Sequence, residues 1–465
     1  MITILFAALL ALSTAIALVD WRRGWLLAVL CGVLQDPARK LTPGAPVAMT
    51  LSIVVVYIVV IFAAQGSLQR EAREFSRRFS QVKVAAGAVF IFLILAALNG
   101  LVTYGLENWK APALALFIYC TPIPAVILGF TWLQREEQMI VFFRFYAILT
   151  SITLIGTVLE YLGYQWRVLG TVALSDVNLR FLPGLQIRML SGFYRAPDIM
   201  GWHAATLTMI GIAMAVRGAT IQRALPWMGV TAWGFLNCLI SGRRKAVYMV
   251  VVFAAAFLFR YLRRLSTSQA MAFLFAGLVV AIVVQKVGQD EGASVYTRGA
   301  ATTQGEVFAR LEGGFFETIR QTGVMGGGLG TATQGVYHVL SEKGAEKMSW
   351  QEGGLGKLTM ELGVPGVAAV AFLAVALLSL MLKISRHRDV PGSSQILRAA
   401  LFGIVIANVV EFMVSAQAYS DAVLTLMTAF FVGCLLATAV LDERLVAASR
   451  ATEPVLRRGT APVTA

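Results

Sequence analysis

The stretch "LPWMGVTAWGFLNCLISGRRKAVYMVVVFAAAFLFR" (residues 225–260) contains two apolar runs separated by Arg243, Arg244 and Lys245. Each run approaches the length of a membrane-spanning helix, which needs roughly 17–25 mostly apolar residues. The stretch therefore predicts two consecutive spans joined by a short hairpin with three positive charges. Because Lys and Arg in short loops favour the cytoplasmic side, that side is the first expectation for this hairpin.

The overall composition agrees with a membrane location. Hydrophobic residues make up 58% of the 465 residues and charged residues only 14%, with a mean hydropathy of +0.74. A soluble domain does not carry such an apolar excess, so the chain is predicted to be a polytopic membrane protein. The 39 basic against 25 acidic residues indicate loops that face anionic lipid rather than nucleic acid. The four cysteines lie in apolar runs and the three histidines form no cluster, so neither a disulfide framework nor a metal site is predicted.

Further apolar runs of similar length predict an all-α polytopic membrane protein with about 12–13 transmembrane helices and a large extracytoplasmic loop. A shorter run at residues 25–34 is either the thirteenth span or a re-entrant piece. The twelve longer runs lie near residues 2–19, 47–65, 84–104, 112–134, 139–162, 199–216, 225–241, 245–260, 269–286, 363–383, 396–416 and 421–440.

The loop charges predict the organisation of the chain. Residues 1–286 would hold transmembrane helices with a smaller outer loop at 163–198, followed by a large outer loop at 287–362. Residues 363–441 would return to the membrane, and 442–465 would form a cytoplasmic tail. This orientation follows from basic segments that favour the cytoplasm, namely 69–83, 260–266, 383–389 and the tail.

The same alternation places the hairpin with Arg243, Arg244 and Lys245 outside, against the positive-inside rule. Three like charges at an outer membrane face are tolerable when an anion lies among them. A phosphate or diphosphate is a natural candidate because Arg binds it in a bidentate manner. A cluster that only anchors two helix ends among lipid headgroups remains an equal alternative.

The large outer loop is too long for a simple connection and too apolar for disorder, so it is predicted to fold over the membrane surface. Its segment 305–321 has the periodicity of an amphipathic helix that lies in the interface. The glycine-rich stretch "TGVMGGGLGTATQG" (322–335) lacks the strand and the Lys-Ser/Thr pair of a nucleotide-binding P-loop. Glu352 and Glu361 follow, nine residues apart, where the loop enters the next span.

Three stretches together resemble the O-antigen ligase and O-antigen polymerase superfamily of bacterial inner-membrane glycosyltransferases, which are GT-C-like in architecture. "GFYRAPDIMG" (192–201) is similar to the family's G-x-F-x-x-P-N-x-L-G element, and "SGRRKAV" (241–247) to its S-R-x-A element. "RLEGGFFETIRQTGVMGGGLGT" (310–331) and "QEGGLGKLTMELGVPG" (351–366) resemble its R…G-x-G-x-G-T and H-N-x-x-L-x-x-L-x-E-x-G-x-x-G block. The resemblance covers roughly residues 185–370.

The resemblance implies a polysaccharide polymerase of the inner membrane with its active site and both outer loops on the periplasmic side. Such an enzyme extends lipid-linked repeat units by glycan transfer from an undecaprenyl-diphosphate carrier, with no metal or nucleotide sugar. An undecaprenyl-diphosphate-linked oligosaccharide would be both donor and acceptor, in the lipid bilayer, and chain-length regulator and export proteins would be partners. Binding of the diphosphate would fall to Arg188, Arg243, Arg244, Lys245 and Arg310.

Glu352 is the implied catalytic residue, because counting back nine residues from Glu361 places it where the family keeps a histidine. A carboxylate there would accept a proton from the incoming hydroxyl as the diphosphate leaves. Arg195, Glu411 and His338 are further candidates, although His338 lies fourteen residues before Glu352 and does not align with the motif.

Three other functions stay open. An O-antigen ligase would transfer the glycan to a lipid core. A transporter or flippase of lipid-linked glycans would also need many spans, but no internal repeat is visible in the sequence. A lipid II polymerase would share the carrier and the membrane face, although the three motifs match the O-antigen group better.

Overall fold

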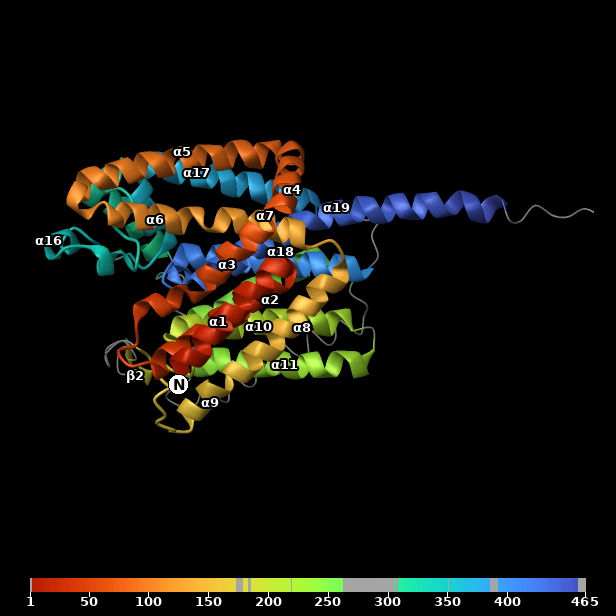
Figure 1. Ribbon diagram of the computed structural model, residues 1–465, viewed down its shortest axis with the longest axis horizontal. Helices are drawn as coiled ribbons and strands as arrows, with labels where there is room; N and C mark the ends of the chain where they lie inside the picture. Colours follow the sequence, from red (N-terminus) through yellow and green to blue (C-terminus); the bar gives the residue numbers. More distant parts are fainter. Residues whose placement is uncertain are drawn as a thin grey trace, which may run out of the picture.

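The computed structural model describes residues 2–172, 179–182, 185–218, 220–261, 305, 308–349, 351–384 and 392–458 (Figure 1). The predicted span 269–286 lies outside the described residues. So do residues 287–304 of the predicted large loop and 459–465 of the predicted tail.

The described chain is a bundle of helices with one small hairpin. Strands β1 (Leu179–Leu182) and β2 (Leu185–Arg188) pair antiparallel in the first outer loop. The helices of the first half are α1 (Ile2–Val19), α2 (Trp21–Leu41), α3 (Ser52–Ala63), α4 (Gln65–Arg78), α5 (Ser80–Tyr104), α6 (Lys110–Cys120), α7 (Pro122–Trp132), α8 (Glu136–Thr153) and α9 (Ile155–Tyr161). Those of the second half are α10 (Pro197–Arg217), α11 (Ile221–Ile240), α12 (Arg244–Tyr261), α15 (Thr318–Thr322), α16 (Glu342–Ala345), α17 (Gly354–Ile384), α18 (Gly392–Val414) and α19 (Ala422–Arg458). Shorter helical turns are η1 (Val47–Leu51), η2 (Leu106–Asn108), η5 (Gly313–Glu317), η6 (Val336–Val339) and η7 (Ala418–Ser420).

The described helices confirm the predicted all-α polytopic membrane fold. Eight helical segments are long and apolar enough to cross a membrane, and the α3–α4 pair, bent by 79°, would make a ninth. Helices α2 and α11 run alongside these segments (Figure 1), and α12 packs against α10 and α18. All three carry charged or polar residues near their ends. The predicted pair of spans at 225–241 and 245–260 corresponds to α11 and α12.

The short apolar run at 25–34 belongs to a longer helix, α2, which is not one of the eight segments apolar enough to cross a membrane by themselves. Helix α2 has 21 residues, which at a rise of about 1.5 Å per residue gives a length of about 30 Å. Thr3 at the start of α1 hydrogen bonds Thr42 just after α2, with 3.1 Å between the two hydroxyl oxygens, so the two helices are antiparallel. Charged residues near the end of α2 shorten the apolar run that the sequence displays.

Segments far apart in the sequence gather at the two ends of the bundle. Helix α4 and the end of α19 lie at one end, and β2 and α16 lie at the other (Figure 1). At the end with α4, the Arg260 guanidinium donates to Leu382 O at 3.0 Å and Arg398 donates to Ile384 O at 2.8 Å. The basic segment 69–83, the described edges of segments 260–266 and 383–389, and the end of α19 therefore lie at one end of the bundle. The loop charges predict that these segments share one side.

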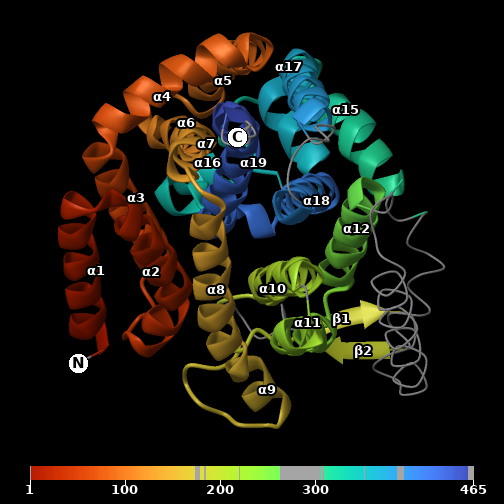
Figure 2. The same ribbon diagram turned by 90° about the vertical axis from the view of Figure 1, so that its right-hand side faces the viewer.

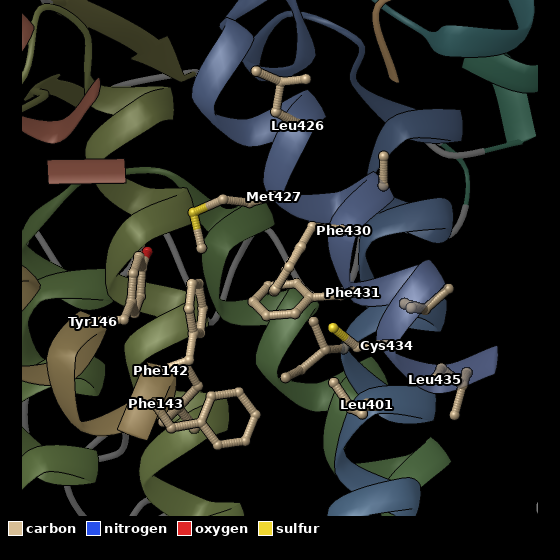
Figure 3. Packing of buried hydrophobic residues seen from close by; sticks show 14 of the residues in the cluster. Phe142, Phe143, Tyr146, Leu401, Leu426, Met427, Phe430, Phe431, Cys434 and Leu435 are labelled. Atoms are coloured by element: carbon tan, nitrogen blue, oxygen red, sulfur yellow. The ribbon is translucent and has the colours of Figure 1, made fainter. Parts of the chain in front are cut away.

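The main core forms where α8, α10, α18 and α19 meet (Figure 2). Its aromatic side chains pack closely. The ring centroids of Phe142 and Phe430 are 5.2 Å apart (Figure 3), and those of Trp25 and Phe430 are 4.8 Å apart. In a bilayer, close packing of this kind, rather than expulsion from water, holds helices together. This core fixes α10 and α18, whose ends carry the candidate site.

A second, smaller core attaches the large outer loop to the bundle. Leu329 and Val336 of the loop are fully buried against Tyr104 and Ala111 on one side and Leu362 of α17 on the other. The predicted amphipathic helix is present over residues 308–322, with a π-helical turn, η5, in its middle. The described part of the loop is thus folded onto α5, α6 and α17.

Candidate functional site

The site begins at the hairpin between α11 and α12. Gly242 adopts φ +69°, a left-handed conformation that a side chain disfavours, and so allows the tight turn. The Arg243 N–H donates to Ser241 Oγ at 3.0 Å, which closes the turn. A Cβ at Gly242 would lie 3.2 Å from Met189 Cγ, so the hairpin packs directly against the first outer loop.

Asp198, in the first turn of α10, lies between two of the three hairpin cations. Its carboxylate is 2.8 Å from Arg243 Nη2 and 2.5 Å from Lys245 Nζ. Lys245 Nζ also donates to Ser415 Oγ at 2.6 Å, just after the end of α18. The hairpin charges are therefore built into a polar cluster with α10 and α18 and do not simply reach out to the lipid.

A small pocket opens beside this cluster. Four charged side chains line it, those of Asp198, Arg243, Lys245 and Glu411, together with the apolar faces of Trp202 and Met249. Glu411 is 8% exposed and lies within electrostatic range of Lys245, Asp198, Arg310 and Arg243. Glu411 lies in the last turn of α18, and its side chain lines the pocket.

The two arginines of the hairpin differ in their surroundings. Arg244, at the start of α12, is only 4% exposed. Arg243 Nε is buried and donates to none of the described residues, while Nη2 of the same guanidinium contacts Asp198. Because a guanidinium offers five donors in a planar fork, Arg243 keeps donor capacity beside the pocket.

Arg310 and Glu352, from the two sides of the glycine-rich segment, meet at the rim of this region. Arg310 Nη2 is 3.1 Å from Glu352 Oε2, and the two side chains are 39% and 51% exposed. The Glu352 carbonyl accepts the Ala416 N–H at 2.8 Å, one residue after Ser415. The structure thus brings Glu352, Arg310, Glu411 and the hairpin cations to the same end of α18, although they are distant in sequence.

Arg188 does not direct its side chain into this cluster. Its Nη2 lies 3.9 Å from Glu160 Oε1, and the side chain is 66% exposed. Glu160 Oε2 in turn accepts the N–H groups of Ser191 and Gly192, at 3.0 and 2.7 Å. Only the Arg188 backbone approaches the hairpin, with its carbonyl 3.7 Å from where a Gly242 Cβ would be.

Arg195 is bound to carboxylates of its own chain. Its Nη1 contacts Asp36 Oδ1 at 3.1 Å and Asp421 Oδ2 at 2.5 Å, and its N–H donates to Asp36 Oδ2 at 3.0 Å. Burial alone would lower the pKa of Arg195, but the Asp421 and Asp36 carboxylates raise it above its ordinary value. Two carboxylates already occupy this guanidinium, so it ties α2, α10 and α19 together.

His338 lies apart from Glu352. It is exposed on η6, and η6 packs against α6. Its N–H donates to Gly335 O at 3.2 Å within the glycine-rich turn. The described contacts of His338 include neither Glu352 nor the hairpin cations.

Sequence reasoning missed the buried supports of the site. Lys40 donates to Gly192 O at 2.8 Å and to Tyr194 O at 2.6 Å, and together with Asp36 it holds the segment that leads into α10. Asp36 and Lys40 are buried near the end of α2, which also carries Arg22, Arg23 and Arg39, and buried charges in a membrane protein are a functional or structural signal. Ser415 carries no such signal, because a serine after a span is unremarkable.

The arrangement offers cations for an anion and carboxylates for a proton, all beside one pocket. Arginine and lysine bind phosphate oxygens through charge-assisted hydrogen bonds, and a carboxylate can act as a general base. Comparison of the chain with models of protein families and with curated proteins gave no match in either case.

Proposed function

We propose that the protein is a bacterial inner-membrane polysaccharide polymerase that transfers glycans from an undecaprenyl-diphosphate carrier on the periplasmic face. The observation that carries the proposal is the convergence of Arg243, Lys245 and Arg310 with Glu352 at one end of the bundle, opposite α4. An outer cluster of cations beside a carboxylate suits a reaction in which a diphosphate leaves and a hydroxyl loses a proton.

The proposed transfer uses the side chains of the candidate site. The acceptor hydroxyl attacks the anomeric carbon of the donor glycan and its proton passes to Glu352. The bond between that carbon and the diphosphate oxygen breaks, and the carrier diphosphate leaves with the electron pair. Arg243, Arg244, Lys245 and Arg310 stabilise the charge that develops on the departing diphosphate, an electrostatic contribution of the kind that often dominates catalysis.

Glycans that accumulate on the carrier in a deletion strain test the proposal. Loss of a polymerase is expected to leave single repeat units on the lipid, as measured by mass spectrometry of extracted carrier-linked glycans. Full-length chains on the carrier would instead identify a ligase. Single repeat units that accumulate on the inner leaflet, and not on the outer one, would identify a flippase.

Arg244→Lys is expected to reduce transfer nearly as much as Arg244→Ala, because a point charge cannot replace a planar fork that binds two phosphate oxygens. The measurement is polymer formation from purified lipid-linked repeat units, at matched amounts of folded protein. The exposed Arg320, whose side chain is 80% exposed and paired with Glu317, provides the control: Arg320→Lys should leave transfer unchanged. Full activity in Arg244→Ala would reduce the hairpin to a membrane anchor.

A further inference from the structure

The glycine-rich segment 323–335 lies between α5 and α17 in close backbone contact with both. A Cβ at Gly328 would be 2.2 Å from Gly100 N, and one at Gly363 would be 2.5 Å from Met325 C. Five glycines of the segment have positive φ: Gly323, Gly326, Gly328, Gly330 and Gly335. The glycines are therefore required by close approach and by left-handed backbone, which gives them a role within the fold.

Carbonyl groups of the segment are paired mainly with α5. Asn99 Nδ2 donates to Gly326 O at 2.9 Å, Thr103 Oγ1 donates to Gly327 O at 2.7 Å, and Tyr104 OH donates to Gly330 O at 2.9 Å. The N–H groups of the segment are divided between the two helices: Leu329 N–H donates to Ala96 O of α5 at 2.9 Å. Gly327 N–H donates to Met360 O at 2.7 Å.

Three further donors of the segment converge on the carboxylate of Glu361, which is fully buried on α17. Glu361 Oε1 accepts the Gly330 N–H at 3.0 Å, the Ala332 N–H at 3.1 Å and Thr333 Oγ1 at 2.7 Å. Oε2 accepts the Tyr119 hydroxyl at 2.6 Å, and the Lys357 ammonium lies 5.5 Å from the Tyr119 ring centroid. A glycine-rich segment whose N–H groups surround an anion usually binds a ligand, but here the anion belongs to the protein.

The chain that leads to Glu352 is connected to this segment, whereas the helix that carries Arg310 packs on α17 itself. Ser349 N–H donates to Thr331 O at 2.9 Å, three residues before Glu352. On the other side, Gly314 packs against the first turn of α17, where its Cβ would lie 3.3 Å from Gly356 N. Gly314 follows Arg310 by one helical turn, so the packing fixes Arg310 as well.

We propose that Glu361 is a positioning residue: its carboxylate binds the glycine-rich segment 323–335 and through it holds Glu352 at the site. The role of Glu352 in this inference rests on the proposed function, whereas the ordering of the segment by Glu361 does not. Glu361 itself does not touch the reacting groups.

Three variants of the full chain test this role. Glu361→Ala leaves four donors without an acceptor, so amide hydrogen exchange of residues 323–335 should become at least about 10-fold faster. Glu361→Gln keeps an acceptor oxygen for the segment, and the Tyr119 hydroxyl can accept from the new amide, so exchange should stay within about 3-fold of wild type. Glu317→Ala, an exposed carboxylate of the same loop, should match wild type.

Transfer should follow the same order, with Glu361→Gln retaining most of the activity that Glu361→Ala loses. Equal loss in both variants would make Glu361 a catalytic residue and overturn the positioning role. Wild-type exchange in Glu361→Ala would also overturn it. If exchange follows the expected order while even the wild-type protein transfers no glycan, the proposed function fails and the binding of the segment by Glu361 stands.

Discussion

Glu352→Gln is expected to lower glycan transfer by about 100-fold or more, the usual scale for loss of a general base. The amide keeps the shape of the carboxylate and one hydrogen bond to Arg310, whose Nη2 is 3.1 Å from Glu352 Oε2 in the native protein. It cannot take a proton from the acceptor hydroxyl. Polymer formation from lipid-linked repeat units measures the loss, and carrier binding should survive because the hairpin cations are unchanged.

Two companion variants locate the base. Glu352→His should restore part of the activity, because an imidazole can accept the same proton. His338→Ala should have little effect, since His338 lies on η6 against α6 rather than at the end of α18. The opposite pattern, an inactive His338→Ala and an active Glu352→Gln, would mean that His338 and not Glu352 is the catalytic residue.

Arg195→Leu is expected to cost about 3–5 kcal/mol of stability, the scale for removing one partner of a buried ion pair. Asp36 and Asp421 are both buried and would lose the guanidinium that lies within 3.1 Å of each carboxylate. The fraction of monodisperse protein and the apparent unfolding temperature in detergent measure the effect. Asp36→Asn in the Arg195→Leu background should recover part of the loss by removing one buried charge.

Arg188→Leu is the matched control, because Arg188 belongs to the same outer loop but is 66% exposed and 3.9 Å from its carboxylate. Its effect on stability should stay within about 1 kcal/mol, as for other exposed pairs. If the Arg195→Leu protein were instead as stable as the wild-type protein and lost only glycan transfer, Arg195 would act in the reaction and not in holding α2, α10 and α19 together.

The candidate site was predictable from the sequence only in part. The order of the motifs pointed to Glu352 and Arg310, and the hairpin that defied the positive-inside rule pointed to Arg243 and Lys245. Which arginine faces a ligand was not predictable, because it depends on partners far along the chain. Arg195 lies three residues from Asp198, yet its carboxylates are 159 and 226 residues away in the sequence.

The sequence by itself determined that the chain is an all-α polytopic membrane protein, because an apolar run is a local property and a bilayer allows a buried backbone few alternatives to the helix. It also determined that the hairpin 241–245 carries three adjacent positive charges between two apolar runs, because charge and loop length are read without coordinates. Only the tertiary structure decided how the charges of α2 are accommodated, since Asp36 and Lys40 are satisfied by Arg195, Gly192 and Tyr194 of the first outer loop. It also decided that the glycine-rich segment binds Glu361, because a buried anion is recognised by donors that converge in space and not by their order in the chain.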